Sequence, residues 1–229
     1  MKVCKACGME KSLSAFPKWK QNGHVYYKAK CSACKSKAYR SRHPETVRAI
    51  QQRARAKYRR NQHRLKRALL DHIGQIACRI CGIDDIRTLS FHHRNPAEKN
   101  FKLSWGFTHS LSLETLKAEA ELCDVLCANC HNVHHYRGDA CDRKEARARA
   151  RRTAILKQQI MRAIGQGACK VCGYKQAPAL SFHHCETSAK GFEMSEAINK
   201  NLPFATLVRE ARKCDVLCMN CHFIKHAEQ

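Results

Sequence analysis

The sequence predicts a small α+β fold stabilised by bound zinc. In this fold an N-terminal zinc ribbon precedes two tandem copies of one small domain, joined by basic helices. Three observations predict this class. Six Cys-x2-Cys pairs account for most of the 16 cysteines, and that spacing is typical of zinc-binding knuckles. Two long stretches of the chain repeat each other. Only 7% of the 229 residues are aromatic, which argues against a single large core.

The six cysteine pairs predict three structural Zn²⁺ sites with four thiolate ligands each. A disulfide framework is the alternative, but it is typical of secreted chains. The sequence has no signal-peptide pattern, so we expect a reducing compartment in which the thiols stay free. The predicted zinc ligands are Cys4, Cys7, Cys31, Cys34, Cys78, Cys81, Cys127, Cys130, Cys169, Cys172, Cys218 and Cys221.

Residues 1–43 are predicted to form a free-standing zinc ribbon, because 23 residues separate their two cysteine pairs. Between the pairs lie several lysines and three aromatic residues, Trp19, Tyr26 and Tyr27. Two roles stay open for this ribbon: it contacts DNA, or it only caps the chain. The cysteines do not decide between them, since a Cys4 zinc site is structural.

The rest of the chain contains one pattern twice. LCDVLCANCHNVHH, residues 122–135, returns as KCDVLCMNCHFIKH, residues 213–226, an offset of 91 residues. Other pairs at the same offset are Cys78/Cys169, His92/His183, His93/His184, Leu65/Leu156, Gly74/Gly165 and Glu119/Glu210. Such a repeat divides the chain. We predict the ribbon over residues 1–43, a basic helix with the first copy over 44–138, and a basic linker helix with the second copy over 139–229.

A basic helix is predicted before each copy. Pro44 suits the start of the first helix and Gly74 its end, and apolar residues at helical spacing lie near one face: Val47, Ile50, Ala54, Tyr58, Leu65, Leu69 and Ile73. The second helix lies in DRKEARARARRTAILKQQIMRAIG. A charge run is usually a solvated face, but balancing acids are nearly absent, so we favour phosphate contact. The arginines expected to bind DNA are Arg48, Arg53, Arg55, Arg59, Arg60, Arg64, Arg147, Arg149, Arg151 and Arg152.

The charge of the whole chain points to the same kind of partner. The formal net charge is +24, from 43 Lys and Arg against 19 Asp and Glu. Such an excess predicts a polyanionic partner, most simply nucleic acid. A polybasic membrane protein is the alternative, but the sequence lacks an apolar run of about 18 residues, so no membrane span is expected.

In each copy, two histidines of a helix and one of a facing strand are predicted to build a metal centre with open positions. In the first copy a short half-buried strand ends in His92-His93, and LETLKAEAEL reads as a helix that leads back to the second cysteine pair. The closing helix is expected to begin at about Cys130. His131 and His135, four residues apart, then share one face of that helix. The neighbouring structural zinc would fix the helix start and so position these ligands.

A packed or surface role is the ordinary explanation of a single histidine. Four histidines are assigned no more than that: His24, His72, His109 and His134. The eight repeated histidines differ, because each zinc already has four cysteines and needs none of them. We therefore predict that they serve function. Cys123 and Cys214 exceed four ligands per zinc and are predicted to be small buried residues.

The pattern C-x2-C, F-H-H, then L-C-x-N-C-H-x3-H resembles the HNH endonucleases, also called ββα-metal or His-Me finger nucleases. It is most similar to their zinc-ribbon subtype, common among phage, homing and restriction enzymes. The resemblance covers both copies of the repeat. It implies two tandem ββα-metal (HNH) domains after the ribbon, and the cytoplasm of a bacterial or phage-infected cell as the location.

The resemblance also assigns roles. His93 and His184 match the general base of the family. The metal ligands that it implies are His92, His131 and His135 in the first copy and His183, His222 and His226 in the second. The family's middle Asn has no clear counterpart, because Asn129 and Asn220 lie within the cysteine pair instead. These two residues are left as structural candidates.

The reaction implied is metal-dependent phosphodiester hydrolysis. A neutral imidazole takes a proton from water, which attacks the phosphorus in line, and the metal neutralises the phosphate and the leaving oxygen. The products would carry a 5′-phosphate and a 3′-hydroxyl. Each centre would hold one divalent ion, with Mg²⁺ or Mn²⁺ as first candidates and Ni²⁺ or Zn²⁺ also suited to imidazole ligands.

Two intact sets of site residues predict an endonuclease that acts on double-stranded DNA as a monomer with internal pseudo-twofold symmetry. Each copy would cut one strand, so that one chain makes a double-strand break, restriction- or homing-like and site-specific. Two alternatives stay open. A non-catalytic multi-zinc nucleic-acid-binding protein would not need His93 or His184. A nickase with one active copy, or an RNA nuclease, would differ in strand count or substrate.

Overall fold

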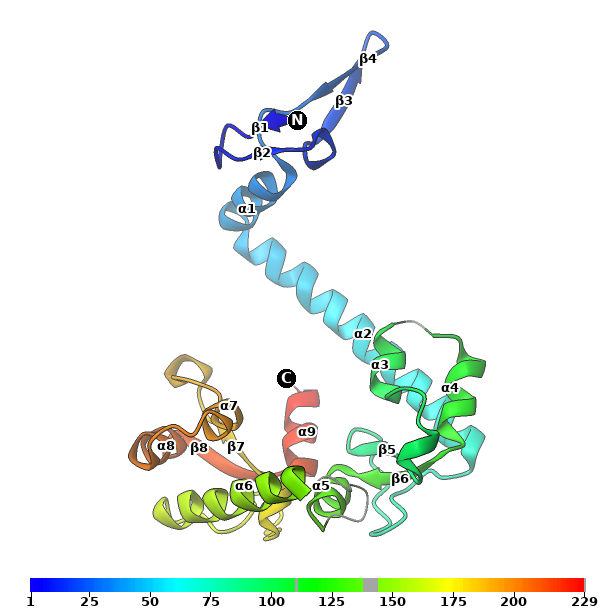
Figure 1. The fold of residues 1–229 in the computed structure, drawn as a ribbon, viewed down its shortest axis with the longest axis vertical. Coiled ribbons are helices and arrows are strands. Elements are labelled where there is room, and N and C mark those ends of the chain that lie inside the picture. The colour runs from blue at the N-terminus through cyan, green and yellow to red at the C-terminus, as the bar shows by residue number, and fades with distance from the viewer. Residues whose placement is uncertain (110, 138–143, 229) are drawn as a thin grey trace. The chain divides into compact units, whose positions relative to one another are not determined.

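The structure, a computed structural model, describes residues 1–109, 111–137 and 144–228. It divides into two compact units, Met1–Asn61 and Gln62–Gln229, whose elements are labelled in Figure 1. Both units combine two-stranded sheets with helices, so the small α+β class is correct. Both copies of the repeat lie in the second unit. The division at residues 43 and 138 stays a prediction, and residue 138 lies outside the described residues.

The first unit is built around the cysteines of the ribbon. Its elements are β1 (Lys2–Val3), β2 (Glu10–Lys11), η1 (Leu13–Ala15), β3 (Lys18–Gln21), β4 (His24–Tyr27) and α1 (Ser32–Arg42). Strand β1 pairs antiparallel with β2, and β3 with β4. The buried core consists of Cys4, Phe16 and Cys31. The β3–β4 turn has positive φ at Asn22 (48°) and Gly23 (77°), as a tight hairpin turn requires.

Helix α2 (Pro44–Ile73) has the bounds that the sequence predicts. Gly74 follows it at φ 67°, the left-handed conformation that commonly ends a helix. Its apolar face is buried only toward the end, at Leu69 and Leu70, whereas Ile50 and Tyr58 are 57% and 48% exposed. The apolar spacing therefore predicts the helix correctly, but only its last turns join a core.

The second unit holds nearly the same series of elements twice, with η3 of the second copy lacking a counterpart among the described residues of the first. In the first copy these are β5 (Leu89–His93), η2 (Pro96–Glu98), α3 (Leu103–Thr108), α4 (Leu113–Ala120), β6 (Cys123–Cys127) and α5 (Ala128–Arg137). Helix α6 (Lys144–Ala163) comes next, and the second copy consists of η3 (Ala177–Ala179), β7 (Leu180–His184), η4 (Thr187–Ala189), α7 (Met194–Asn199), α8 (Phe204–Ala211), β8 (Cys214–Cys218) and α9 (Met219–Glu228). None of the helices in the described part of the chain is long and apolar enough to cross a membrane.

Each copy centres on one two-stranded antiparallel sheet, and the register of the two strands is the same in both copies. His92 lies opposite Asp124 and His93 opposite Cys123, and His183 and His184 have the equivalent partners in β7 and β8. The two histidines of each pair have different neighbours. His92 lies beside His131 and His135 of α5, whereas His93 contacts Glu119 of α4.

Parts of this architecture were not predicted. Strands β6 and β8 are implied only by the resemblance and not by the residue pattern, and helices α1, α3 and α7 are not predicted at all. The closing helices begin at Ala128 and Met219 rather than at about Cys130. The cause is that each helix starts directly where its strand ends, and the Ala128 N–H donates to the Thr88 carbonyl at 2.9 Å. The second cysteine pair therefore spans the strand end and the first helical turn.

The two copies meet through a reciprocal pair of asparagines. The Asn129 N–H donates to Oδ1 of Asn220, and the Asn220 N–H donates to Oδ1 of Asn129, both at 3.1 Å. Both side chains are buried, at 6% and 5% exposure. A contact in which residue i meets j and j meets i in the same way is the signature of twofold symmetry. These residues, left as structural candidates from the sequence, join the two copies.

Candidate metal and catalytic centres

Five groups of side chains in the described residues lie close enough to hold metal ions, and within each group the ligand atoms lie within 4.8 Å of one another. Three groups consist of cysteines: Cys4, Cys7, Cys31 and Cys34; Cys78, Cys81, Cys127 and Cys130; Cys169, Cys172, Cys218 and Cys221. Two consist of histidines: His92, His131 and His135; His183, His222 and His226. The structure thus brings together every set of ligands that the sequence predicts.

In each cysteine group, backbone N–H groups favour the thiolate form of the first cysteine, whereas the pKa of Cys34, Cys130 and Cys221 is raised by neighbouring thiols and burial. The N–H groups of Cys31 and Ala6 donate to Sγ of Cys4 at 3.2 and 3.4 Å, and these bonds lower the pKa of Cys4 to about 6. Burial would raise the pKa of Cys78 and Cys169, but N–H donors outweigh it and bring each pKa to about 7. Zinc binds thiolates, so the cysteine groups suit zinc.

The two histidine groups have the geometry of ligands that converge on one ion. Nε2 of His131 and Nε2 of His135 lie 3.2 Å apart, as do those of His222 and His226. Two imidazole nitrogens bound at about 2.1 Å to one ion lie roughly 3.0 to 3.4 Å apart. The strand histidine of each group, His92 in the first, completes a set of three nitrogen donors that fits a divalent cation.

Burial keeps these imidazoles in the form that binds a metal. It lowers the pKa of His92 and His131 to about 4, with neighbouring histidines adding to the effect. In the second copy burial and His226 lower the pKa of His222 to about 4. Burial and Lys225 also lower the pKa of His183. A histidine must be neutral to donate a lone pair to a metal, so these groups are ready to bind near pH 7.

The fourth histidine of each copy, which follows the strand ligand in the sequence, contacts a buried glutamate. Nε2 of His93 lies 2.7 Å from Oε1 of Glu119, and Nε2 of His184 lies 2.9 Å from Oε1 of Glu210. The glutamates are 1% and 4% exposed. An ionised carboxylate only accepts hydrogen bonds, so Nε2 of each histidine carries the proton in this contact.

Other donors hold each glutamate ionised. Burial would raise the pKa of Glu119, but hydrogen bonds from Asn100, His93 and the Phe101 N–H outweigh it, and the pKa lies below its ordinary value. Burial acts the same way on Glu210, where bonds from Lys213, the Gly191 N–H and His184 lower the pKa to about 2. Both carboxylates therefore present a fixed negative charge to a histidine ring.

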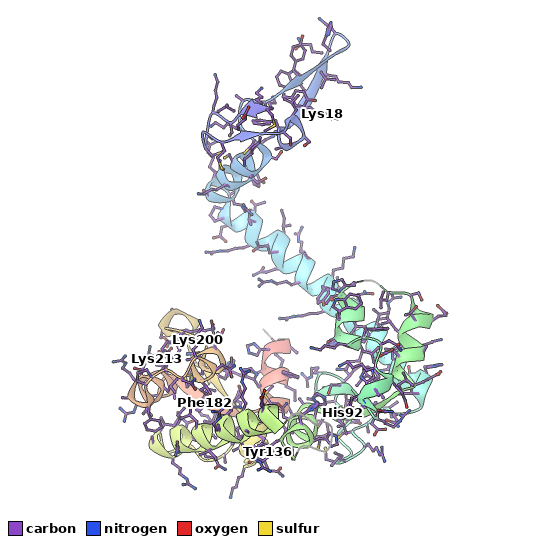
Figure 2. All side chains as sticks on the ribbon, viewed as in Figure 1. Lys18, His92, Tyr136, Phe182, Lys200 and Lys213 are labelled. Atoms are coloured by element: carbon purple, nitrogen blue, oxygen red, sulfur yellow. The ribbon has the colours of Figure 1, made fainter. Side chains whose placement is uncertain are left out.

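All four histidines of the second copy line one cavity of about 810 Å³. His183, His222 and His226 contribute the metal group and His184 the histidine bonded to glutamate. Lys157 and Lys190 also line it, so cationic side chains accompany the candidate ligands. Figure 2 labels Phe182, which lies on β7 next to His183, and His92 in the first copy.

Sequence reasoning missed two kinds of residue here. The sequence identifies Glu119 and Glu210 only as a repeated pair. A glutamate among apolar residues of a short helix is nevertheless a signal that its side chain is buried against a partner. His134 was set aside as ordinary, yet its ring centre lies 4.5 Å from that of His92. Cys123 and Cys214 are buried, as predicted, and each Sγ donates to a glutamate backbone carbonyl, that of Glu119 or of Glu210.

The arginines predicted to bind DNA are exposed where the structure describes their side chains: Arg48, Arg53, Arg55, Arg59, Arg60, Arg64, Arg149, Arg151 and Arg152. The side chain of Arg147 lies outside the described part. Arg149 and Arg152 line a second hollow of about 690 Å³ beside His135. No protein-family model, no curated protein and no solved structure matches the chain.

Proposed function

We propose that this chain is a metal-dependent DNA endonuclease with two ββα-metal (HNH) active sites, each of which hydrolyses one strand of a duplex. One observation carries the proposal: twice, a three-histidine group accompanies a fourth histidine at the next strand position. The cysteine groups supply four ligands each, so the histidines are not needed for structural zinc. The order strand, strand, helix around each group also agrees with the arrangement that the resemblance implies.

The fourth histidine would act as the general base. His93 donates its Nε2 proton to Glu119, so the other ring nitrogen, Nδ1, keeps a lone pair that accepts a proton from the attacking water. The charge that then forms on the ring is stabilised by the ionised carboxylate. His184 and Glu210 would act in the same way in the second copy. Glu119 and Glu210 are positioning residues, because they act through the histidines.

The histidine groups would hold one divalent cation each. His92, His131 and His135 in the first copy, and their counterparts in the second, offer three neutral nitrogens and leave further coordination positions open. A bound cation would neutralise the scissile phosphate and the charge that develops on the departing 3′ oxygen. Mn²⁺, Ni²⁺ and Zn²⁺ suit an all-imidazole set at least as well as Mg²⁺.

The reciprocal asparagine contact supports the two-strand part of the proposal. The strands of a DNA duplex are related by local twofold axes, so two sites related by a twofold axis face equivalent phosphodiesters. Asn129 and Asn220 lie directly before Cys130 and Cys221, and His131 and His222 follow. The contact between the copies is therefore adjacent in sequence to both metal groups.

Cleavage of supercoiled plasmid tests the catalytic proposal. Wild-type protein freed of loosely bound metal should cleave only after Mg²⁺, Mn²⁺, Ni²⁺ or Zn²⁺ is added. The double variant His93→Ala/His184→Ala should bind the plasmid without cutting it. His109→Ala, which removes an exposed histidine outside both groups, should cut normally. If the wild-type protein slows the migration of plasmid on a gel but leaves it uncut with every metal, the chain is a non-catalytic, zinc-containing DNA-binding protein instead.

A further inference from the structure

The β3–β4 hairpin of the first unit carries an aromatic pair outside the ribbon core. Trp19 and Tyr26 lie opposite each other in the register, and their rings stack with centres 5.4 Å apart. They are 39% and 44% exposed. The core of the ribbon is formed by Cys4, Phe16 and Cys31. Folding of the zinc centre therefore does not account for the exposed pair.

Lysines surround this pair on both faces of the hairpin. Nζ of Lys28 lies 4.7 Å from the ring centre of Trp19. Lys18 and Lys20 flank Trp19 in β3, and alternation along the strand directs them to the other face. Figure 2 labels Lys18 on the hairpin. The hairpin thus has lysines on both faces and the exposed aromatic pair on one, while Tyr27 on the other face packs against the ribbon core.

Acidic residues that could balance these lysines are absent from the sequence around the hairpin. No Asp or Glu occurs between Glu10 and Glu45. Over residues 1–61 there are 17 Lys and Arg against those two acids, a net charge of +15. An aromatic cross-strand pair also stabilises a hairpin, but that role requires neither its exposure nor this charge.

We infer that the β3–β4 hairpin is a second DNA-binding element, which enters the major groove of a duplex. The major groove is wide enough to admit a two-stranded β-ribbon. Lys18, Lys20 and Lys28 would contact phosphates, and the Trp19–Tyr26 pair would pack against base edges. The inference goes beyond cleavage, because it holds equally if the histidine centres prove inactive.

Tryptophan fluorescence tests this directly, since the chain has two tryptophans. The full chain carrying Trp105→Phe keeps Trp19 as its one tryptophan, and His93→Ala/His184→Ala in the same chain prevents cleavage. A short duplex oligonucleotide should quench or shift Trp19 emission to saturation, at a lower concentration than the matching single strand. Unchanged emission during duplex binding, absence of duplex binding, or a response to the single strand alone would overturn the inference.

A matched pair of variants supplies the second readout. Trp19→Ala should weaken duplex binding about tenfold, as truncation of an aromatic anchor in an interface does, measured by anisotropy of a labelled duplex, with zinc content equal to that of the parent. Trp105→Ala removes the other tryptophan, which is 46% exposed in the second unit, and should change affinity less than about twofold. Equal losses in the two variants would contradict the assignment. Cleavage by wild type is scored separately, so failure of the nuclease proposal and failure of this one are distinguishable.

Discussion

The two copies in the second unit have the same arrangement of the proposed metal ligands and general base, but the residues around these groups differ. The ring centre of the strand histidine lies 5.1 and 4.9 Å from those of the two helix histidines in the first copy. The corresponding distances in the second copy are 5.2 and 5.0 Å. The histidine–glutamate contacts are 2.7 and 2.9 Å long. The groups that would bind metal and move a proton are therefore alike.

Their neighbours differ in charge. The side chain of Asn100 bonds to Glu119 at 2.9 Å, whereas Glu210 receives the ammonium of Lys213 at 2.8 Å. His134 lies beside the first metal group, and the residue 91 positions later is Lys225. Both centres therefore keep the same four histidines and one glutamate, while the charges around them differ. We expect both to be active, with different affinity for metal.

The largest effect is expected from loss of a zinc ligand in one copy. Cys127→Ala should unfold the first copy and reduce zinc content by one ion per chain, because a structural zinc contributes on the order of 10 kcal/mol. Zinc content and thermal unfolding measure this. Cys123→Ala, a buried cysteine in the same strand but outside the cysteine group, is the control and should keep its zinc. Full zinc content in Cys127→Ala would show that this cysteine is not a ligand.

The contact between the copies gives the next effect. Asn129→Ala leaves the buried Asn220 N–H without its acceptor, which should lower the free energy of unfolding by about 1–3 kcal/mol. Denaturant unfolding measures the loss. Asn132→Ala, in the same helix, removes a bond from its side chain to the Ala128 carbonyl and should cost less. Equal losses would show that the asparagine pair has no special part in joining the copies.

These two features differ in how far the sequence predicts them. The cysteine groups follow from the Cys-x2-Cys spacing together with the absence of a signal-peptide pattern, which argues against disulfides. The asparagine pair does not, because a contact between residues 91 positions apart depends on how the copies pack. The same limit hid Glu119 and Glu210, whose partners come from another element. The residue pattern does not predict strand β6, because CDVLC is too short a run for periodicity to assign it to a strand or a helix.

A smaller effect is expected when the carboxylate beside the base loses its charge. In a His184→Ala background, Glu119→Gln should slow nicking by the first copy about tenfold without changing DNA affinity. Glu119→Asp should restore part of the rate. Glu121→Gln is the matched control, because Glu121 contacts His72 at 2.7 Å in an exposed pair outside the centre. A normal rate in Glu119→Gln would assign the glutamate a structural role only.

The smallest effect should come from exchanging the residues that distinguish the centres. His134→Lys should weaken Co²⁺ binding by the first copy about fivefold, since one added positive charge nearby costs about 1 kcal/mol at the effective dielectric constant of a protein surface. Lys225→His should strengthen binding by the second copy to a similar degree. Titration followed by Co²⁺ absorbance measures both. Unchanged affinities would mean that these neighbours do not account for any difference between the copies.

The most direct test of the central claim is the topology of plasmid products from single-site variants. Wild-type protein should convert supercoiled plasmid to linear DNA. His93→Ala and His184→Ala should each stop at nicked circles. Each variant removes the general base of one copy, so the rate at which that copy cuts its DNA strand falls about 10²–10⁴-fold. The account is contradicted if either single variant still yields linear DNA at the wild-type rate, since one copy would then cut both strands.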